Sequence, residues 1–330
     1  MRLCYRLFPP LLLAAALTLG GCAAPAAPSS PAPDGPAYTF TDDLGRQVVL
    51  DAPPRRVAAG MGSFAQVWLL AGGQLAAATR DAWEEGGITR DGRVPGLEGS
   101  QPSDSPIVDL GSLKKPSVET MVEAGVDFVL LSAKLEEHLQ LQDQLEALGI
   151  PCAYFEVELF QDYLEMLKVC TDLTGREDLY RQHGADVADR IQGAVRRGAG
   201  QEGSTVLFIR AFATGARAKG SDNMTGAMLR DLGCVNIADR QGSLLEDLSL
   251  EIIIQEDPDF ILVVTMGEDP QKALDSMKTL LEDNPAFGGL SAVRDGRYLL
   301  LPKDLFHLKP NHRWGESYEY LADVLYGPTT

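Results

Sequence analysis

Apolar residues follow two different spacings along the chain. After a hairpin predicted at Tyr38–Leu50 around the turn signal DLGR, short apolar runs alternate with segments in which apolar residues recur every three or four positions. These patterns predict strands at Val57–Ala59, Gln74–Arg80, Asp127–Leu131 and Pro151–Phe155, and helices at Ser63–Ala71, Ser117–Ala124 and Glu136–Leu148. Strands that alternate with helices predict a parallel sheet covered on both faces.

A long helical pattern follows, and then the alternation resumes. Phe160–Gly198 has helical spacing almost throughout, with Gly175 and Gly184 as candidate interruptions. The remaining predictions are strands at Thr205–Ile209, Phe260–Thr265 and Tyr298–Leu301, and helices at Asp222–Leu232, Leu250–Glu256, Pro270–Glu282 and around Trp314–Leu325. The predicted fold is α/β, with two Rossmann-like lobes of parallel-type sheets, one long connecting helix, and a ligand cleft between the lobes.

One helix-to-strand unit occurs twice, 132 residues apart. SVETMVEAGVDFVLL begins at Ser117, and SLEIIIQEDPDFILV begins at Ser249. In both, a Glu is followed eight positions later by the Asp that opens an apolar run. The repeat indicates two lobes built on one plan.

The first 37 residues indicate export. Arg2 and Arg6 precede an apolar run at Leu11–Leu19, which is far shorter than the roughly 20 residues of a spanning helix. The next residues, Gly20-Gly21-Cys22, predict a signal peptide over 1–21 and lipidation of Cys22; an ordinary signal peptide with a chance Cys is the alternative. A Pro/Ala/Ser-rich tether at 22–37 follows. The predicted divisions are then 38–157 for the first lobe, 158–198 for the connection and 199–330 for the second lobe.

Charge and cysteine content exclude several classes of protein. The formal charge is −18, and it becomes −20 once Arg2 and Arg6 are removed with the signal, which argues against nucleic acid and against electrostatic binding to anionic lipid. Cys152, Cys170 and Cys234 remain in the mature chain without a CxxC motif, so neither a disulfide framework nor a zinc site is predicted. Buried thiols are the ordinary interpretation, and a single disulfide among them stays open.

The sequence motifs do not indicate an enzyme. Gly198–Gly203 matches GxGxxG, but it precedes a strand instead of following one, which fails the dinucleotide context. The sequence has no GxSxG, P-loop or HExxH and only four His. We therefore expect no enzyme, no catalytic residue and no cofactor.

Five motifs in order carry a family resemblance. They are FTDDLGRQVVLDAPPRRVAAG, the repeated Glu-helix and Asp-Phe strand, LTGRED, MLRDLGCVNIAD and NPAFGGLSAVRDGRYLLLP. Across Tyr38–Tyr326 the chain resembles the lipid-anchored substrate-binding proteins of ABC importers for iron–siderophores, haem and cobalamin. The resemblance implies a monomer, lipid-anchored outside the cytoplasm, that captures a metal chelate and delivers it to a permease dimer with its ATPase. It also implies that Glu119 and Glu251 dock against permease arginines.

The ends of the predicted strands indicate where a ligand would bind. Ligands of open parallel sheets sit beyond the carboxyl ends of the strands. This rule selects loops that contain Met61, Ser63, Phe64, Trp83 and Lys134 in the first lobe, and Arg210, Arg217, Lys219, Met266, His307, Lys309 and Arg313 in the second.

Three kinds of contact are expected there. The five second-lobe cations suit an anionic ferric siderophore, and Phe64, Trp83 and Phe306 would supply flat apolar walls. Met61 and His307 would be the axial ligands if the cargo were haem, the one case with direct metal ligation. Haem or cobalamin is the alternative ligand, and a lipid-anchored binding or sensor protein without a transporter is the alternative class.

Overall fold

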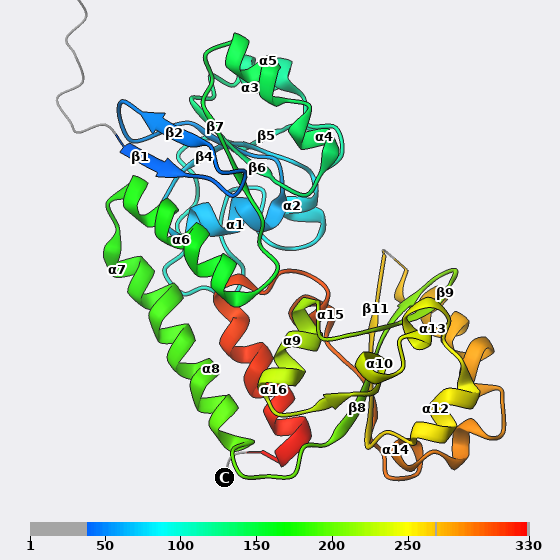
Figure 1. Cartoon of the computed structure of the whole chain (residues 1–330). Coiled ribbons are helices and arrows are strands. Elements are labelled where there is room, and N and C mark those ends of the chain that lie inside the picture. The colour runs from blue at the N-terminus through cyan, green and yellow to red at the C-terminus, as the bar shows by residue number, and fades with distance from the viewer. Residues whose placement is uncertain (1–37, 268, 329–330) are drawn as a thin grey trace, which may run out of the picture. The chain divides into compact units, whose positions relative to one another are not determined.

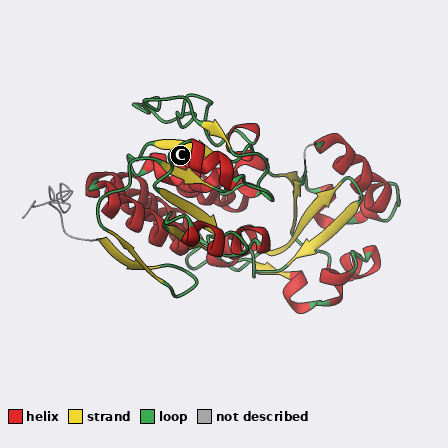
Figure 2. Ribbon diagram, turned by 90° about the horizontal axis from the view of Figure 1, so that it is seen from above, coloured by secondary structure: helices red, strands yellow, loops and turns green. Residues whose placement is uncertain are grey.

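The computed structural model describes residues 38–267 and 269–328. The predicted signal peptide, Cys22 and the tether to residue 37 lie outside the described residues. Two mainly parallel sheets organise this part of the chain, and both belong to one unit, Pro36–Thr330 (Figures 1 and 2). No helix among the described residues is long and apolar enough to cross a membrane.

The first lobe contains a five-stranded parallel sheet in the order β5-β4-β3-β6-β7. An antiparallel hairpin precedes it, as the alternation at Tyr38–Leu50 predicted. The strands are β1 (Tyr38–Thr41), β2 (Gln47–Leu50), β3 (Val57–Ala59), β4 (Leu75–Ala78), β5 (Val108–Asp109), β6 (Phe128–Ser132) and β7 (Cys152–Phe155). The helices are α1 (Gly62–Leu70), α2 (Asp81–Glu84), α3 (Val118–Glu123), α4 (Glu136–Leu139) and α5 (Gln142–Ala147).

The single helix predicted at Glu136–Leu148 is wrong, because the segment forms α4 and α5. His138 lies in α4 and is 0% exposed. Its Nδ1 accepts a hydrogen bond from the Ser132 amide at 2.9 Å, and its Nε2 lies 2.9 Å from the Leu113 carbonyl oxygen. These contacts come from the end of β6 and from a loop 25 residues earlier, so helical periodicity does not reveal them.

The connection between the lobes is a helical hairpin instead of one long helix. α6 (Phe160–Thr174) ends at Gly175, whose φ of 70° lies in the left-handed region that favours glycine. The chain then runs without interruption through α7 (Glu177–Tyr180), a π-helical turn at Arg181–Ala185, and α8 (Asp186–Arg197). Tyr163 near the start of α6 donates a hydrogen bond to the His183 carbonyl at 2.8 Å, so α6 folds back on this second helical run.

The second lobe repeats the parallel order as β10-β8-β11-β12, with β9 added antiparallel to β8. Its strands are β8 (Thr205–Phe212), β9 (Gly215–Lys219), β10 (Val235–Asn236), β11 (Phe260–Thr265) and β12 (Tyr298–Leu300). Its helical segments are α9 (Met224–Asp231), α10 (Ile237–Arg240), α11 (Ser243–Glu246), α12 (Leu250–Glu256), α13 (Pro270–Met277), Lys278–Glu282, Phe287–Gly289, α14 (Ser291–Arg294), α15 (Lys303–Phe306), Asn311–Arg313 and α16 (Trp314–Tyr326).

The hairpin β8–β9 corrects the prediction of a cleft loop at Arg210–Ser221. The pair is antiparallel, so this sheet is mixed. β9 begins directly after the turn at Gly215, whose φ of 148° suits glycine.

The internal repeat is confirmed by the topology. β4-β3-β6-β7 corresponds strand for strand to β10-β8-β11-β12. Asp127 accepts hydrogen bonds from the Arg55 and Arg56 amides, both at 2.9 Å, and Asp259 accepts one from Thr205 at 2.8 Å. Each carboxylate therefore ties the start of one strand to the start of its parallel neighbour, β6 to β3 in the first lobe and β11 to β8 in the second.

One apolar core runs through both lobes. It joins inner faces of the two sheets to α1, α6, α8 and α16, while separate clusters lie under the outer helices of each lobe. α8 and α16 are also linked by ion pairs, Arg190–Glu319 at 2.6 Å and Arg197–Asp323 at 2.7 Å. A shared core resists large rearrangement, so we expect the two lobes to move little relative to each other.

Candidate functional site

Two adjoining pockets lie where the carboxyl ends of the two sheets meet. Their volumes are about 250 and 950 Å³. Residues that line both come from the two lobes: Asp81, Glu85, Leu113, Asp304, His307 and Leu308. We call these pockets together the cleft. Its position agrees with the strand-end rule.

The first-lobe wall is formed by the starts of α1 and α2. The Gly62 amide donates to Asp81 Oδ2 at 2.6 Å, and a Cβ on Gly62 would lie 2.5 Å from the Ala82 Cα. The close approach of the two helix starts therefore requires glycine. Among the described residues, Ser63 Oγ and Asp81 Oδ1 are buried without a hydrogen-bond partner. Buried polar atoms are rarely left unpaired, so this wall has unused capacity for a ligand.

The second-lobe wall centres on His307. Burial lowers the pKa of His307 to about 4, with Lys303 and Arg210 adding to the effect, so the imidazole is neutral at pH 7. Lys303 donates to the Gly267 carbonyl at 2.6 Å. A neutral imidazole in the cleft can donate or accept a hydrogen bond, or coordinate a metal.

Asn311 connects the floor of the cleft across the lobes. Its side chain is 1% exposed, and Nδ2 donates to the Ser63 carbonyl at 3.1 Å and to Gln66 Oε1 at 2.6 Å. Gln66 Nε2 donates in turn to the Gly87 carbonyl at 2.7 Å. Asn311 holds this position with a φ of 51°. The cleft floor is thus fixed by a short hydrogen-bond chain.

None of the three predicted aromatic walls lines the cleft. Phe64 is 2% exposed and packs edge-on against Phe155, and Phe306 is fully buried against Tyr320. Both face the core, because α1 and α15 turn their apolar sides inward. Trp83 is half-buried on α2 beneath the Arg90 guanidinium, 4.0 Å from the ring centroid.

Three of the predicted cations are neutralised by ion pairs. Lys309 pairs with Glu158 at 3.0 Å, Lys134 with Glu156 at 2.6 Å, and Arg313 with both Asp304 and Glu316. The pairing raises the pKa of Arg313 above its usual value. These residues are less available to an anionic ligand than the sequence predicted.

Arg210 differs from these three. It is half-buried on β8, its Nε is buried without a partner, and no ion pair forms there among the described residues. Burial lowers the pKa of Arg210. Arg210 lines neither cleft pocket, and its charge contributes to the lowered pKa of His307. Arg217 lies opposite it on β9 and is exposed, and Lys219 ends the same strand.

The remaining predicted residues lie in the cleft, in the core or on exposed helices. Met61 and His307, from different lobes, line the same pocket, and Ser63, Lys309 and Arg313 line it with them. Met266 packs against the main core and lines neither cleft pocket. Glu119 and Glu251 are exposed on α3 and α12.

Sequence reasoning missed the acidic side of the cleft. Asp81, Glu85 and Asp304 line it, and burial together with Asp81 raises the pKa of Glu85. Asp81 and Glu85 lie just beyond β4, so the strand-end rule selected their loop, but the choice of Trp83 overlooked its acidic neighbours.

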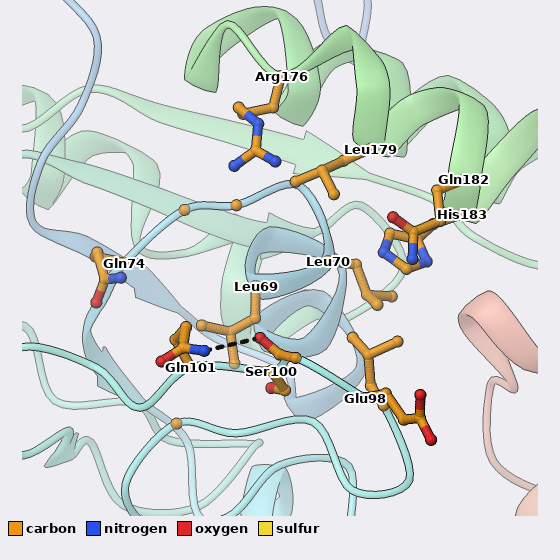
Figure 3. A pocket seen from close by; sticks show the side chains of 15 residues that line it. Leu69, Leu70, Gln74, Glu98, Ser100, Gln101, Arg176, Leu179, Gln182 and His183 are labelled. Carbon is orange, nitrogen blue, oxygen red and sulfur yellow. Dashed lines mark hydrogen bonds between the residues drawn. The ribbon is translucent and has the colours of Figure 1, made fainter.

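A third pocket, of about 350 Å³, shares no lining residue with the cleft (Figure 3). It lies between the end of α1, the loop at 92–101 and the helical run that contains Arg176 and His183. Arg176 forms a bidentate pair with Asp178.

Comparisons with known proteins identify the family. The sequence matches the periplasmic binding protein family over residues 65–305, and the chain belongs to that family. Its members are extracytoplasmic solute-binding proteins and not enzymes. No curated protein matched the sequence.

Solved structures share the fold at low sequence identity. Staphylococcus aureus IsdE, complexed with haem, is 13% identical with a TM-score of 0.61, covering 82% of this chain and 98% of its own. S. aureus SirA, complexed with staphyloferrin B, is 16% identical with a TM-score of 0.62, covering 88% and 97%. The iron-uptake protein FeuA of Bacillus subtilis is 18% identical with a TM-score of 0.63, covering 88% and 99%.

Proposed function

We propose that this chain is a lipid-anchored binding protein of an ABC importer that captures an iron chelate outside the cytoplasm. The observation that carries the proposal is the cleft between the lobes, where Ser63 Oγ and Asp81 Oδ1 are buried without partners. Similar folds that hold haem or staphyloferrin B support a chelate as cargo. The lipid anchor depends on Cys22, which lies outside the described residues.

A ferric siderophore is the cargo that we favour. Arg210 offers a partly desolvated cation without an ion pair among the described residues, which suits a carboxylate or catecholate arm. Asp81 and Ser63 would take hydroxyl or amide donors of the same ligand. The mixed charge of the cleft therefore fits a chelate with both kinds of group.

Haem is the second candidate, because Met61 and His307 line one pocket from opposite lobes. The lowered pKa of His307 keeps its imidazole neutral and able to bind iron. A corrinoid such as cobalamin remains a further alternative of the same importer class.

An absorbance and tryptophan-fluorescence titration of the unlipidated domain from Tyr38 tests these candidates. Haemin, cyanocobalamin and a panel of ferric siderophores are added separately. Siderophore binding should weaken at least tenfold in Arg210→Ala, corresponding to about 1.4 kcal/mol, and not in Arg196→Ala, an exposed control on α8. A haemin Soret shift that survives in His307→Gln and Met61→Ala would exclude haem ligation by this pair.

Delivery is proposed to use Glu119 and Glu251 as contacts with arginines of a permease dimer that works with its ATPase. Both carboxylates are exposed, and neither forms an ion pair within the described residues. Glu119→Ala with Glu251→Ala should reduce uptake while ligand affinity stays unchanged, and the pair Glu136→Ala with Glu246→Ala, exposed on other helices of the two lobes, serves as control. Equal loss of ligand affinity would contradict the docking role, and normal uptake would favour a binding or sensor protein without a transporter.

A further inference from the structure

Each helix of the repeated unit exposes one large apolar side chain at the same position. Val122 on α3 is 48% exposed, and Ile254 on α12 is 41% exposed. They are separated by the same 132 residues as Glu119 and Glu251. In both lobes the apolar residue follows the Glu by three positions.

This spacing places each apolar side chain beside its carboxylate. Residues three apart on a helix are neighbours on one face. Met121 and Ile253, both 0% exposed, anchor the opposite faces of α3 and α12 in the outer cores of their lobes. The Glu and its apolar neighbour are therefore held outward together.

α3 and α12 begin and end with the same kinds of cap, which fixes their orientation. Ser117 Oγ accepts from the Thr120 amide at 3.1 Å, and Ser249 Oγ accepts from the Ile252 amide at 3.4 Å. At the far ends, Gly125 and Asp257 take positive φ values of 63° and 38°. Figure 1 shows α3 and α12 as separate elements, one in each lobe.

A single exposed apolar residue is ordinary on a protein surface. An exposed apolar residue that occurs at the same position in both lobes is more informative. Each lobe has a branched aliphatic side chain beside a carboxylate that forms no ion pair among the described residues. Carboxylates without ion pairs among the described residues, on a chain of charge −18, call for a cationic partner. They disfavour an anionic lipid surface.

We infer that Val122 and Ile254 form two apolar contacts with the permease, each set beside the Glu that meets a permease cation. The inference rests on the proposed delivery function and adds a contact that salt does not screen. The partner surface must offer, twice, a cationic side chain next to an apolar depression. Burying two aliphatic side chains there would strengthen docking about tenfold or more.

The test measures binding of ligand-loaded protein to its cognate permease in nanodiscs at low and high salt. Val122→Ser with Ile254→Ser should weaken binding about tenfold at both salt concentrations. Glu119→Gln with Glu251→Gln should weaken it mainly at low salt. Val49→Ser with Leu300→Ser is the matched control, because these residues are 54% and 51% exposed and lie one in each lobe.

The outcomes separate the inference from the proposed function. If the Glu pair weakens binding and the apolar pair does not, the apolar contact is refuted and the docking role stands. If neither pair changes binding, both are refuted. Binding to permease-free anionic vesicles, or self-association lost in the Val122→Ser and Ile254→Ser variant, would also overturn the inference by assigning the surface to lipid or to a second copy.

Discussion

Asn311 should be one of the costliest polar side chains to remove from this protein. It joins the second lobe to α1 of the first through hydrogen bonds to the Ser63 carbonyl and Gln66 Oε1. Asn311→Ala leaves Gln66 Oε1 unpaired at the cleft floor, where Gln66 is 9% exposed, and removes one of two bonds to the Ser63 carbonyl, which also accepts a bond within α1. An unpaired buried group costs about 1–3 kcal/mol, so we expect loss of the hydrogen bonds to lower the free energy of unfolding by about 1–3 kcal/mol.

The backbone adds a second, separable cost at this position. Asn311 has a φ of 51°, where Asn is tolerated and a residue with an ordinary Cβ is strained by about 1 kcal/mol. Asn311→Gly removes the same hydrogen bonds without that strain, so it should be about 1 kcal/mol more stable than Asn311→Ala. Asn311→Asp should be at least as damaging as Ala, because its carboxylate would face two acceptor oxygens.

Urea unfolding of the three variants measures these differences, and calorimetry should show the melting temperature of Asn311→Ala lowered by roughly 3–7 °C. A double-mutant cycle with Gln66→Ala isolates the pairwise coupling. If Asn311→Ala unfolds within about 0.5 kcal/mol of the parent protein, the hydrogen-bond chain does not hold the lobes as argued. If Gly and Ala are equally destabilised, the strain argument is wrong.

Three further predictions follow from the structure. Burial lowers the pKa of His307 and of His312 to about 4, whereas His in the unfolded chain has a pKa near 6.5. Between these two values the unfolded chain binds more protons than the folded chain, so the free energy of unfolding should fall as pH drops from about 6.5 to about 4. Urea titrations across that range measure the slope, which His312→Gln should flatten. Gly62→Ala should lower the free energy of unfolding by about 1–3 kcal/mol and weaken ligand binding, because its Cβ would lie 2.5 Å from the Ala82 Cα. Calorimetry measures the stability, and the ligand titration described above measures the binding. Unchanged stability would mean that α1 and α2 can move apart without cost. The three free thiols are buried, and burial raises the pKa of each, that of Cys234 to about 12; they are Cys152, Cys170 and Cys234. In the domain from Tyr38 all three should resist a thiol reagent until urea unfolds the chain. Rapid labelling of the native protein would contradict their burial.

Local patterns predicted the strands and the plan of the lobes well. The apolar runs at Val57–Ala59 and Phe260–Thr265 became central strands, because such runs are buried on both faces of a parallel sheet. The Ser-x-Glu repeats became capped helices, because Ser side chains at those positions pair with free amides of the first turn. Both features depend on neighbours in sequence.

Side-chain direction was predicted less well. Phe64 near the start of α1 and Phe306 at the end of α15 both follow the carboxyl ends of strands, yet both are buried in the core. The break between α4 and α5 was not predicted either, and His138 beside it bonds to Ser132 at the end of β6 and to Leu113, 25 residues away. Periodicity identifies an element, but it does not show which residue turns inward at the element's end.

The sequence by itself determined the two-lobe α/β plan and several of the segments that line the cleft, because each is encoded in residues close together along the chain. The export signal rests on the sequence alone and stays a prediction. Only the tertiary structure decided which charges remain available. Lys309 and Arg313 find acidic partners, whereas Arg210 keeps an unpaired nitrogen. Ion pairs form between residues brought together by folding, and Lys309 and Glu158 are 151 positions apart. The character of the cleft is therefore a property of the folded chain.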